Sequence, residues 1–317
     1  MKKPKTLQQA IIHFSNPDNC LAFMVARRWP TGVHCPTCAS KDVRFLSTRR
    51  LWECKNKHPR KQFSVKVGTI FEDSALPLDK WLVAIWMVAN CKNGVSSYEV
   101  GRALGVTQKS AWFMLHRIRL AMQARSFVKM GGPGTEVEVD ETFIGGLSRN
   151  MHADVRKRRI FNPRSKDKTP VLGILERGGK IHAKVVPNVR KSHIQPAIRN
   201  HVHAGSAIYT DSLLSYWGLN ETYVHKTIDH AERYVDGQVH TNGLENFWSL
   251  LKRGLKGTYI SVEPFHLFRY LDEQVFRYNF RKLPHDGARF EHVASHLFGK
   301  RLTYAEVTGK VGETAVN

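Results

Sequence analysis

Apolar residues recur with two different periods along this chain, and the places where the period changes mark its segments. Helical spacing of three and four runs through residues 7–14 and from Pro77 to about Met122, whereas residues 33–67 and much of the chain after 134 show the alternation of short β-strands. The pattern predicts a multidomain α/β protein in which helical and strand-rich segments follow one another.

Turn-forming residues between these segments suggest where domains begin and end. The clearest linker is "GGPG" at 131–134, because glycine and proline clusters break both periods. We expect an N-terminal helical segment at 1–30, a strand-rich module at 31–70, a helical domain at 77–125, an α/β domain at 134–285 and a C-terminal tail at 286–317.

The α/β domain is predicted from an alternation of strands and helices. Strand-like "TEVEVDETFIGG" precedes a basic loop from about 148 to 168, the hairpin "VLGILERGGKIHAKVVP", the helix "SHIQPAIRNHV" and the strand "SAIYTD". Two amphipathic helices follow, "NGLENFWSLLKRGLKG" and "PFHLFRYLDEQVFRYNF". This order separates the domain from the helical domain that precedes it.

The charge balance adds an expected partner. The chain has 49 Lys and Arg against 27 Asp and Glu, a formal net charge of +22. This excess favours a protein that binds a polyanion, such as double-stranded DNA, over one that is basic without such a partner. A signal peptide, a long apolar run and a lone basic amphipathic segment are all missing from the sequence. We therefore expect a cytoplasmic protein, associated with the nucleoid when bound to DNA, and no membrane partner.

A cysteine cluster in the strand-rich module has the spacing of a zinc site. Cys35 and Cys38 form a C-x-x-C pair, Cys54 follows after fifteen residues, and His58 lies four positions further on. Structural zinc takes four nitrogen or sulfur ligands, so we predict Zn²⁺ held by these four side chains. His58 is preferred over His34, which adjoins Cys35 and would strain the turn. A redox pair is the alternative, and Cys54 argues against it.

Residues 94–122 predict two helices joined by a turn, with the spacing of a helix-turn-helix. The expected core residues of this pair are Val100, Ala103, Val106, Trp112 and Leu115. The second helix would offer its N-terminal residues to base edges or phosphates, namely Thr107, Gln108, Lys109 and Ser110. A plain helical hairpin in a bundle is the alternative.

Carboxylates stand at the ends of two predicted strands. The alternation in "TEVEVD" places Asp140 where its strand ends, and Asp211 comes just after the strand in "SAIYTD". The carboxyl ends of strands are where α/β enzymes hold catalytic groups. By the period of two, Glu138 shares the strand face of Asp140 and could support the site, whereas Glu141 should point away.

The helix predicted over 242–256 has an apolar stripe and a polar stripe. The apolar stripe should face a core and comprises Leu244, Phe247, Trp248, Leu251 and Leu255. The neighbouring polar stripe comprises Asn242, Glu245, Ser249, Lys252 and Lys256. Glu245 joined to Asp140 and Asp211 could hold a pair of divalent ions, Mg²⁺ or Mn²⁺, because hard cations prefer carboxylate oxygens. An ordinary solvated helix face is the alternative.

The order of these motifs resembles that of bacterial insertion-sequence transposases of the zinc-ribbon DDE type. The resemblance spans roughly Cys35 to Arg281 and rests on the cysteine module, the helix-turn-helix, "EVDETFIGG", "YTD" and "HTNGLENFWSLLKRGLKGTY". It implies a zinc ribbon, a helix-turn-helix and an RNase H-like catalytic domain, which is a mixed β-sheet with flanking helices. "CKNKH" departs from the second C-x-x-C of the pattern, which leaves the fourth zinc ligand open.

The same resemblance assigns roles to the site residues. It implies that Asp140, Asp211 and Glu245 are catalytic and hold two Mg²⁺ or Mn²⁺ ions, with Asn242 or Asn246 as other candidates for the third position. Lys252 matches the lysine that follows the third acid by seven residues in the family, and the resemblance implies that it is catalytic as well. With Arg253 and Lys256, it would also bind DNA.

The resemblance implies a DNA transposase that binds terminal inverted repeats, hydrolyses the phosphodiester at the element end and transfers the freed 3′-hydroxyl to target DNA. Such an enzyme is expected to act as a homo-oligomer. Two alternatives stay open: a catalytically silent DNA-binding regulator with a transposase-like fold, and a nuclease that cuts without joining.

Overall fold

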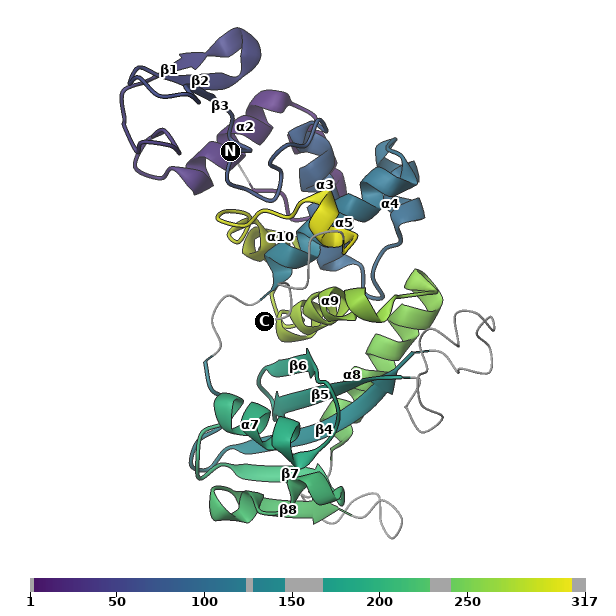
Figure 1. Cartoon of the computed structure of the whole chain (residues 1–317). Helices are drawn as coiled ribbons and strands as arrows, with labels where there is room; N and C mark the ends of the chain where they lie inside the picture. Colours follow the sequence, from purple (N-terminus) through teal and green to yellow (C-terminus); the bar gives the residue numbers. More distant parts are fainter. Residues whose placement is uncertain (1–2, 124–127, 146–167, 229–240, 310–317) are drawn as a thin grey trace. The chain divides into compact units, whose positions relative to one another are not determined.

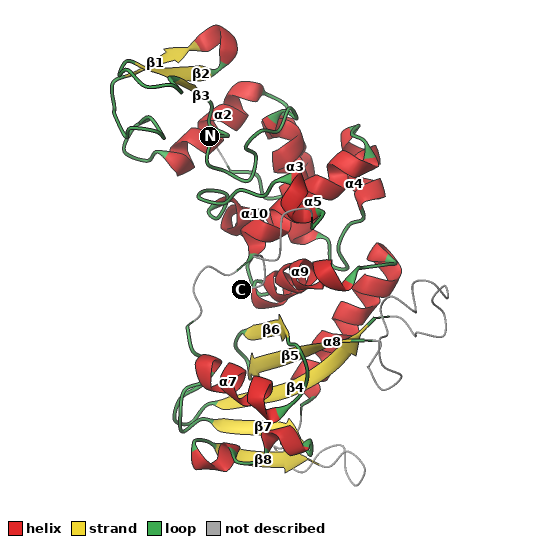
Figure 2. Cartoon of the chain, viewed as in Figure 1, coloured by secondary structure: helices red, strands yellow, loops and turns green. Residues whose placement is uncertain are grey.

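A computed structural model of the chain describes residues 3–123, 128–145, 168–228 and 241–309 (Figures 1 and 2). The chain folds as two units, Met1–Gln123 with Lys282–Asn317, and Ala124–Arg281. The basic loop expected at about 148–168 lies almost wholly outside the described residues. No helix in the described ranges is long and apolar enough to cross a membrane.

The first unit begins with two helices and a small antiparallel sheet. Helices α1 (Leu7–Phe14) and α2 (Pro17–Arg28) precede strands β1 (Val43–Leu46), β2 (Leu51–Cys54) and β3 (Gln62–Phe63), which pair in the order β1-β2-β3. Trp52 of β2 packs on Trp29 and Phe63, with ring centroids 5.4 and 6.1 Å away. Aromatic packing of this kind compensates for the small size of the sheet.

Three helices form the centre of the first unit: α3 (Leu78–Asn90), α4 (Ser97–Leu104) and α5 (Gln108–Met122). Ser96 and Glu99 form a capping box at the start of α4, and Gly105 ends that helix in the left-handed conformation. Of the five core residues expected in this helix pair, Val100 and Leu115 are buried, Val106 and Trp112 are partly exposed, and Ala103 is exposed. Ala103 was therefore wrongly placed, because it falls on the outer side of α4.

The end of the chain belongs to the first unit. Helix α10 (Asp286–Ala294) packs on α3, where the Phe290 ring lies 5.0 Å from that of Trp86, and the short helix α11 (Tyr304–Val307) contacts α5. The buried Arg117 donates hydrogen bonds to the carbonyls of Ile70, Glu72 and Leu302. The segment treated above as a C-terminal tail thus supplies core residues to the N-terminal unit.

The second unit is built on a five-stranded mixed sheet. Its strands are β4 (Glu136–Ile144), β5 (Thr169–Glu176), β6 (Ile181–Val185), β7 (Ala207–Asp211) and β8 (Val224–Ile228), in the order β6-β5-β4-β7-β8. Strands β4, β5 and β6 pair antiparallel, whereas β7 runs parallel to both β4 and β8. The predicted hairpin, strands and helices of this domain are all present.

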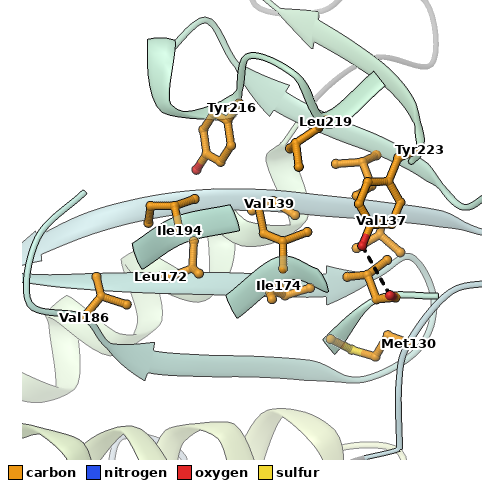
Figure 3. Packing of buried hydrophobic residues seen from close by; sticks show 13 residues of the cluster. Met130, Val137, Val139, Leu172, Ile174, Val186, Ile194, Tyr216, Leu219 and Tyr223 are labelled. Atoms are coloured by element: carbon orange, nitrogen blue, oxygen red, sulfur yellow. Dashed lines mark hydrogen bonds between the residues drawn. The ribbon is translucent and has the colours of Figure 1, made fainter. Parts of the chain in front are cut away.

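Helices cover both faces of this sheet, because alternate residues of the central strands are apolar on each side. Figure 3 shows one face, where Val139, Ile174, Ile194 of α7 (Lys191–His201) and Tyr216 belong to one buried apolar cluster. On the other face, α8 (Asn242–Gly254) and α9 (Leu267–Asn279) pack on the sheet. The apolar stripe predicted for α8 is buried throughout, which leaves its polar stripe outside the core.

Candidate active site

Asp140 and Asp211 lie on neighbouring parallel strands. The last parallel pair between β4 and β7 is Glu138 with Tyr209, so extending that register by two residues sets Asp140 opposite Asp211. The expectation that Asp140 ends its strand was wrong, because β4 continues to Ile144 and pairs Asp140 with Gly173 of β5. Asp211 is the last residue of β7 rather than the residue after it. The two carboxylates therefore lie close together at the end of β7, where β4 continues without a parallel neighbour.

Glu141 joins these two aspartates. Carboxylate oxygens of Asp140, Glu141 and Asp211 all lie within 4.8 Å of one another. The prediction that Glu141 points away was wrong: the hydroxyl of Tyr216, a fully buried residue just after β7, donates a 2.6 Å hydrogen bond to Glu141 Oε2. Glu141 still leaves β4 on the face opposite Asp140, because Asp140 contacts Trp248 of α8 and Glu141 contacts Tyr216 on the other side of the sheet. Since β7 ends at Asp211, both carboxylates reach the open edge of the sheet beyond it and come together there.

Helix α8 is fixed against the sheet beside this cluster. The indole Nε1 of Trp248 donates a 2.9 Å hydrogen bond to Asp140 Oδ2, and its ring lies over Gly173, where a Cβ atom would come within 2.5 Å of the ring. Glu138 Oε2 accepts the backbone N–H of Leu244 at 3.0 Å, and its other oxygen accepts a 2.9 Å bond from Arg177. Glu138 thus fixes the start of α8 against the face of β4 that also carries Asp140.

Asp140 and Glu141, together with most of the polar stripe of α8, line one open cleft of about 620 Å³. Glu245 is exposed in the first turn of α8, and its charge acts on Asp140. Basic side chains follow along the same helix and the turn after it. The cleft is lined by Asp140, Glu141, Thr142, Glu245, Trp248, Ser249, Lys252, Arg253 and Lys256.

Crowding and burial make the negative charges of this site costly. Burial raises the pKa of Asp140 to about 6, and the nearby carboxylates of Asp211 and Glu245 act in the same direction against the Trp248 hydrogen bond. Burial likewise raises the pKa of Glu141 to about 7, assisted by Asp211 and Asp140 and opposed by the Tyr216 hydrogen bond. A set of oxygen donors that repel one another in this way fits a hard divalent cation, which would offset the repulsion.

The four predicted zinc ligands come together in the first unit. The ligand atoms of Cys35, Cys38, Cys54 and His58 lie within 4.8 Å of one another, with Cys35 Sγ 3.4 Å from His58 Nε2 and Cys38 Sγ 3.5 Å from Cys54 Sγ. These spacings suit four ligands around one tetrahedral ion. His34 instead sets its ring edge against Trp29 at 6.1 Å. The cluster supports a structural zinc.

The four residues predicted to contact DNA from α5 lie at its start and are largely exposed, but they also make contacts within the chain. Thr107 caps the helix and donates to Ser110 Oγ at 2.9 Å, and Gln108 Nε2 donates to Ser97 Oγ at 2.8 Å. The Lys109 ammonium lies 5.0 Å from the ring centre of Tyr304. If these side chains contact DNA, their present hydrogen bonds and ring contact within the chain would be replaced by contacts with the DNA.

Sequence reasoning missed the places of three residues in this cluster. Glu141 was set aside by strand period, Tyr216 carried no motif, and Trp248 was assigned only to the packed stripe. The one local signal was the position of Trp248 at the border of that stripe, three residues after Glu245, where an indole N–H can reach a polar partner.

Fold and site together define a zinc-ribbon protein with a carboxylate-bearing α/β domain. Residues 130–279 match the family described as ISXO2-like transposase domain, and residues 15–56 match the transposase zinc-ribbon domain. The chain belongs to the zinc-ribbon DDE-type transposases of insertion sequences.

Two relatives carry related names. The "Uncharacterized protein in transposable element ISH50" of Halobacterium salinarum is 28% identical over 239 residues, which cover 72% of this chain and 79% of the relative. An "Uncharacterized transposase-like protein" of Haemophilus influenzae is 34% identical over 101 residues, covering 32% of this chain and 81% of the relative. Both similarities agree with the family assignment.

Proposed function

We propose that this protein is a DNA transposase that binds the terminal inverted repeats of an insertion sequence, hydrolyses the phosphodiester at the element end and joins the freed 3′-hydroxyl to target DNA. The observation that carries the proposal is one cleft lined by both partly buried carboxylates and basic side chains. The strand order, with three antiparallel strands and two further parallel ones, supports an RNase H-like domain.

In this proposal the carboxylates bind metal ions and the basic side chains bind DNA phosphates. Asp140, Asp211 and Glu245, with Glu141 beside them, would hold two Mg²⁺ or Mn²⁺ ions. Bound there, the ions would supply activation of the attacking water or hydroxyl and stabilisation of the leaving oxygen. Lys252, Arg253 and Lys256 would bind the phosphates on either side of the scissile bond.

Supporting residues keep this arrangement in place. The Trp248 indole orients Asp140, the Tyr216 hydroxyl orients Glu141, and Glu138 anchors the start of the helix that carries Glu245. Rigid placement of this kind is what electrostatic catalysis requires.

The first unit would recognise the element end. Its zinc ribbon and the α4–α5 pair, used as a helix-turn-helix, would read the inverted repeat through Thr107, Gln108, Lys109 and Ser110. We propose that two or more copies act together, because a transposition event must hold both ends of the element.

Strand transfer tests the proposal directly. Purified protein is mixed with labelled DNA carrying the flanking inverted repeat of its own gene and with a plasmid target, in Mg²⁺ and in EDTA. We expect joined product only with Mg²⁺, its loss in Glu245→Ala, and its retention in Glu221→Ala, another exposed glutamate of the same unit. Asp140→Asn should bind ends nearly as well as the wild type without cutting.

The rival functions give different results in the same assay. Specific end binding without cutting or joining would identify a silent DNA-binding regulator. Cutting without joining would identify a nuclease. A Glu245→Ala variant that still joins would remove Glu245 from the metal site.

A further inference from the structure

Helix α8 continues into an unusual turn directly after its basic residues. Residues Leu255–Tyr259 form a π-helical turn, and Ile260 follows at φ 63° and ψ −59°, where the N–H of Ser261 donates to the carbonyl of Tyr259 at 2.6 Å. This is a γ-turn of the strained, positive-φ kind. A β-branched residue in such a conformation costs about 1–3 kcal/mol.

No packing of the Ile260 side chain within the unit compensates for this backbone strain. It is 82% exposed, so burial of apolar surface does not offset the cost of its backbone conformation. The neighbouring Gly257 and Ser261 are exposed as well. Strain held at an exposed apolar residue beside a catalytic cleft points to a use outside the folded unit.

Buried charged residues hold the turn in place. The Tyr259 hydroxyl donates to the carboxylate of Glu273 on α9, which is fully buried and also accepts a hydrogen bond from Arg277. Arg277 donates in addition to Gln274 Oε1 at 2.9 Å, and the Tyr259 ring packs edge-on against Tyr270 at 4.7 Å. A buried ion pair adds little net stability. We therefore take the pair of Glu273 and Arg277 to fix the geometry of the turn through Tyr259.

The held segment begins at the basic rim of the cleft. Lys256 lines the cleft together with Asp140, and Ile260 follows it by four residues. A polyanion bound along Lys252, Arg253 and Lys256 would therefore run close to the exposed isoleucine. Proteins that bend or open DNA insert apolar side chains such as isoleucine between base steps.

We propose that residues 255–262 form a DNA-deforming loop, in which Lys256 binds the backbone and Ile260 enters between bases next to the scissile phosphate, while Tyr259, Glu273 and Arg277 position the loop. The inference rests on the proposed function, because it places the DNA in the cleft. It adds one apolar DNA contact, Ile260, and the residues that position it to a site whose other proposed DNA contacts are charged side chains.

Base unstacking in the bound complex tests the loop. Asp140→Asn chains, which should hold the DNA uncut, are saturated with end duplexes carrying 2-aminopurine at successive positions around the cleavage site. We expect fluorescence to rise several-fold at one or two of these positions. Adding Ile260→Gly should abolish the rise, and adding Tyr259→Phe should reduce it.

Glycine at 260 separates the loop's role from folding. Because glycine tolerates positive φ, Ile260→Gly should have a thermal unfolding midpoint equal to or above that of its parent. Ile12→Ala removes another exposed isoleucine, 66% accessible in the first unit, and should keep the full fluorescence rise. A rise unchanged by Ile260→Gly, or no rise in any chain at saturation, would overturn the proposal.

Cleavage by the wild-type protein is measured separately. Cutting and joining with no unstacking signal would leave the transposase standing and remove the loop. An Ile260-dependent signal in a protein that never cuts would support the loop and remove the catalytic proposal.

Discussion

The indole Nε1 of Trp248 donates a hydrogen bond of 2.9 Å to Oδ2 of Asp140. The bond joins the packed stripe of α8 to a carboxylate of the candidate active site, and the absence of a side chain at Gly173 leaves room for the ring. A residue that belongs to the hydrophobic core by its period therefore also orients a polar group of the site.

Removing this donor should weaken metal binding. The hydrogen bond orients the Asp140 carboxylate and lowers its pKa, so Trp248→Phe should leave this ligand free to turn away and cost about 1 kcal/mol in ion affinity. We expect the Mg²⁺ concentration for half-maximal DNA cleavage to increase about 3–10-fold. Trp217→Phe, at a tryptophan that is 64% exposed, is the control. The same Mg²⁺ dependence in both variants would contradict the role assigned to Trp248.

The crowded carboxylates should make the stability of the protein without Mg²⁺ or Mn²⁺ fall with rising pH. The pKa values of Asp140 and Glu141 are raised to about 6 and about 7, so between about pH 4 and pH 7 the folded state holds protons that the unfolded chain has lost. The free energy of unfolding without added Mg²⁺ or Mn²⁺, in buffer that leaves the zinc bound, should therefore decrease by about 1–3 kcal/mol across this window and stay level above it.

Glu141→Gln isolates one part of this effect, because the amide keeps an acceptor for Tyr216 without a charge. Urea denaturation from pH 4.5 to pH 8 should show a shallower decline for the variant. Added Mg²⁺ should stabilise the wild type increasingly as pH rises, since it binds the ionised carboxylates. Parallel curves for the two proteins would show that Glu141 does not titrate in this way.

The identity of the fourth zinc ligand can be read from metal content. His58→Ala should lose most of its bound zinc and bind the element end at least about tenfold more weakly, because the ribbon loses its central support. His58→Cys should retain the metal through a thiolate, and His34→Ala should be unaffected. Zinc measured by atomic absorption and end binding measured by gel shift check these results.

Two outcomes would count against the zinc prediction. A His58→Ala protein with one zinc per chain would exclude His58 as a ligand. End binding that survives Cys38→Ser unchanged would separate the zinc module from DNA recognition.

Local patterns were sufficient wherever the physics is local. The period of 3.6 identified the buried stripe of α8, and the cysteine spacing predicted four ligands that do lie together. Each of these features depends on residues a few turns or one hairpin apart. The order of motifs along the chain then indicated the transposase family.

Only the tertiary structure decided which distant groups meet. Glu141 joins Asp211 because β4 extends beyond its parallel partner, and the local period cannot show where a partner strand ends. Trp248 reaches Asp140 because Gly173, on a third element, leaves room for its ring. Phe290 enters the core of the N-terminal unit from near the other end of the chain. The sequence by itself determined the individual helices and strands, because their patterns are local. Strand register, the point where a strand ends beside its partner, and the close approach of side chains depend on contacts between elements, so only the tertiary structure decided them.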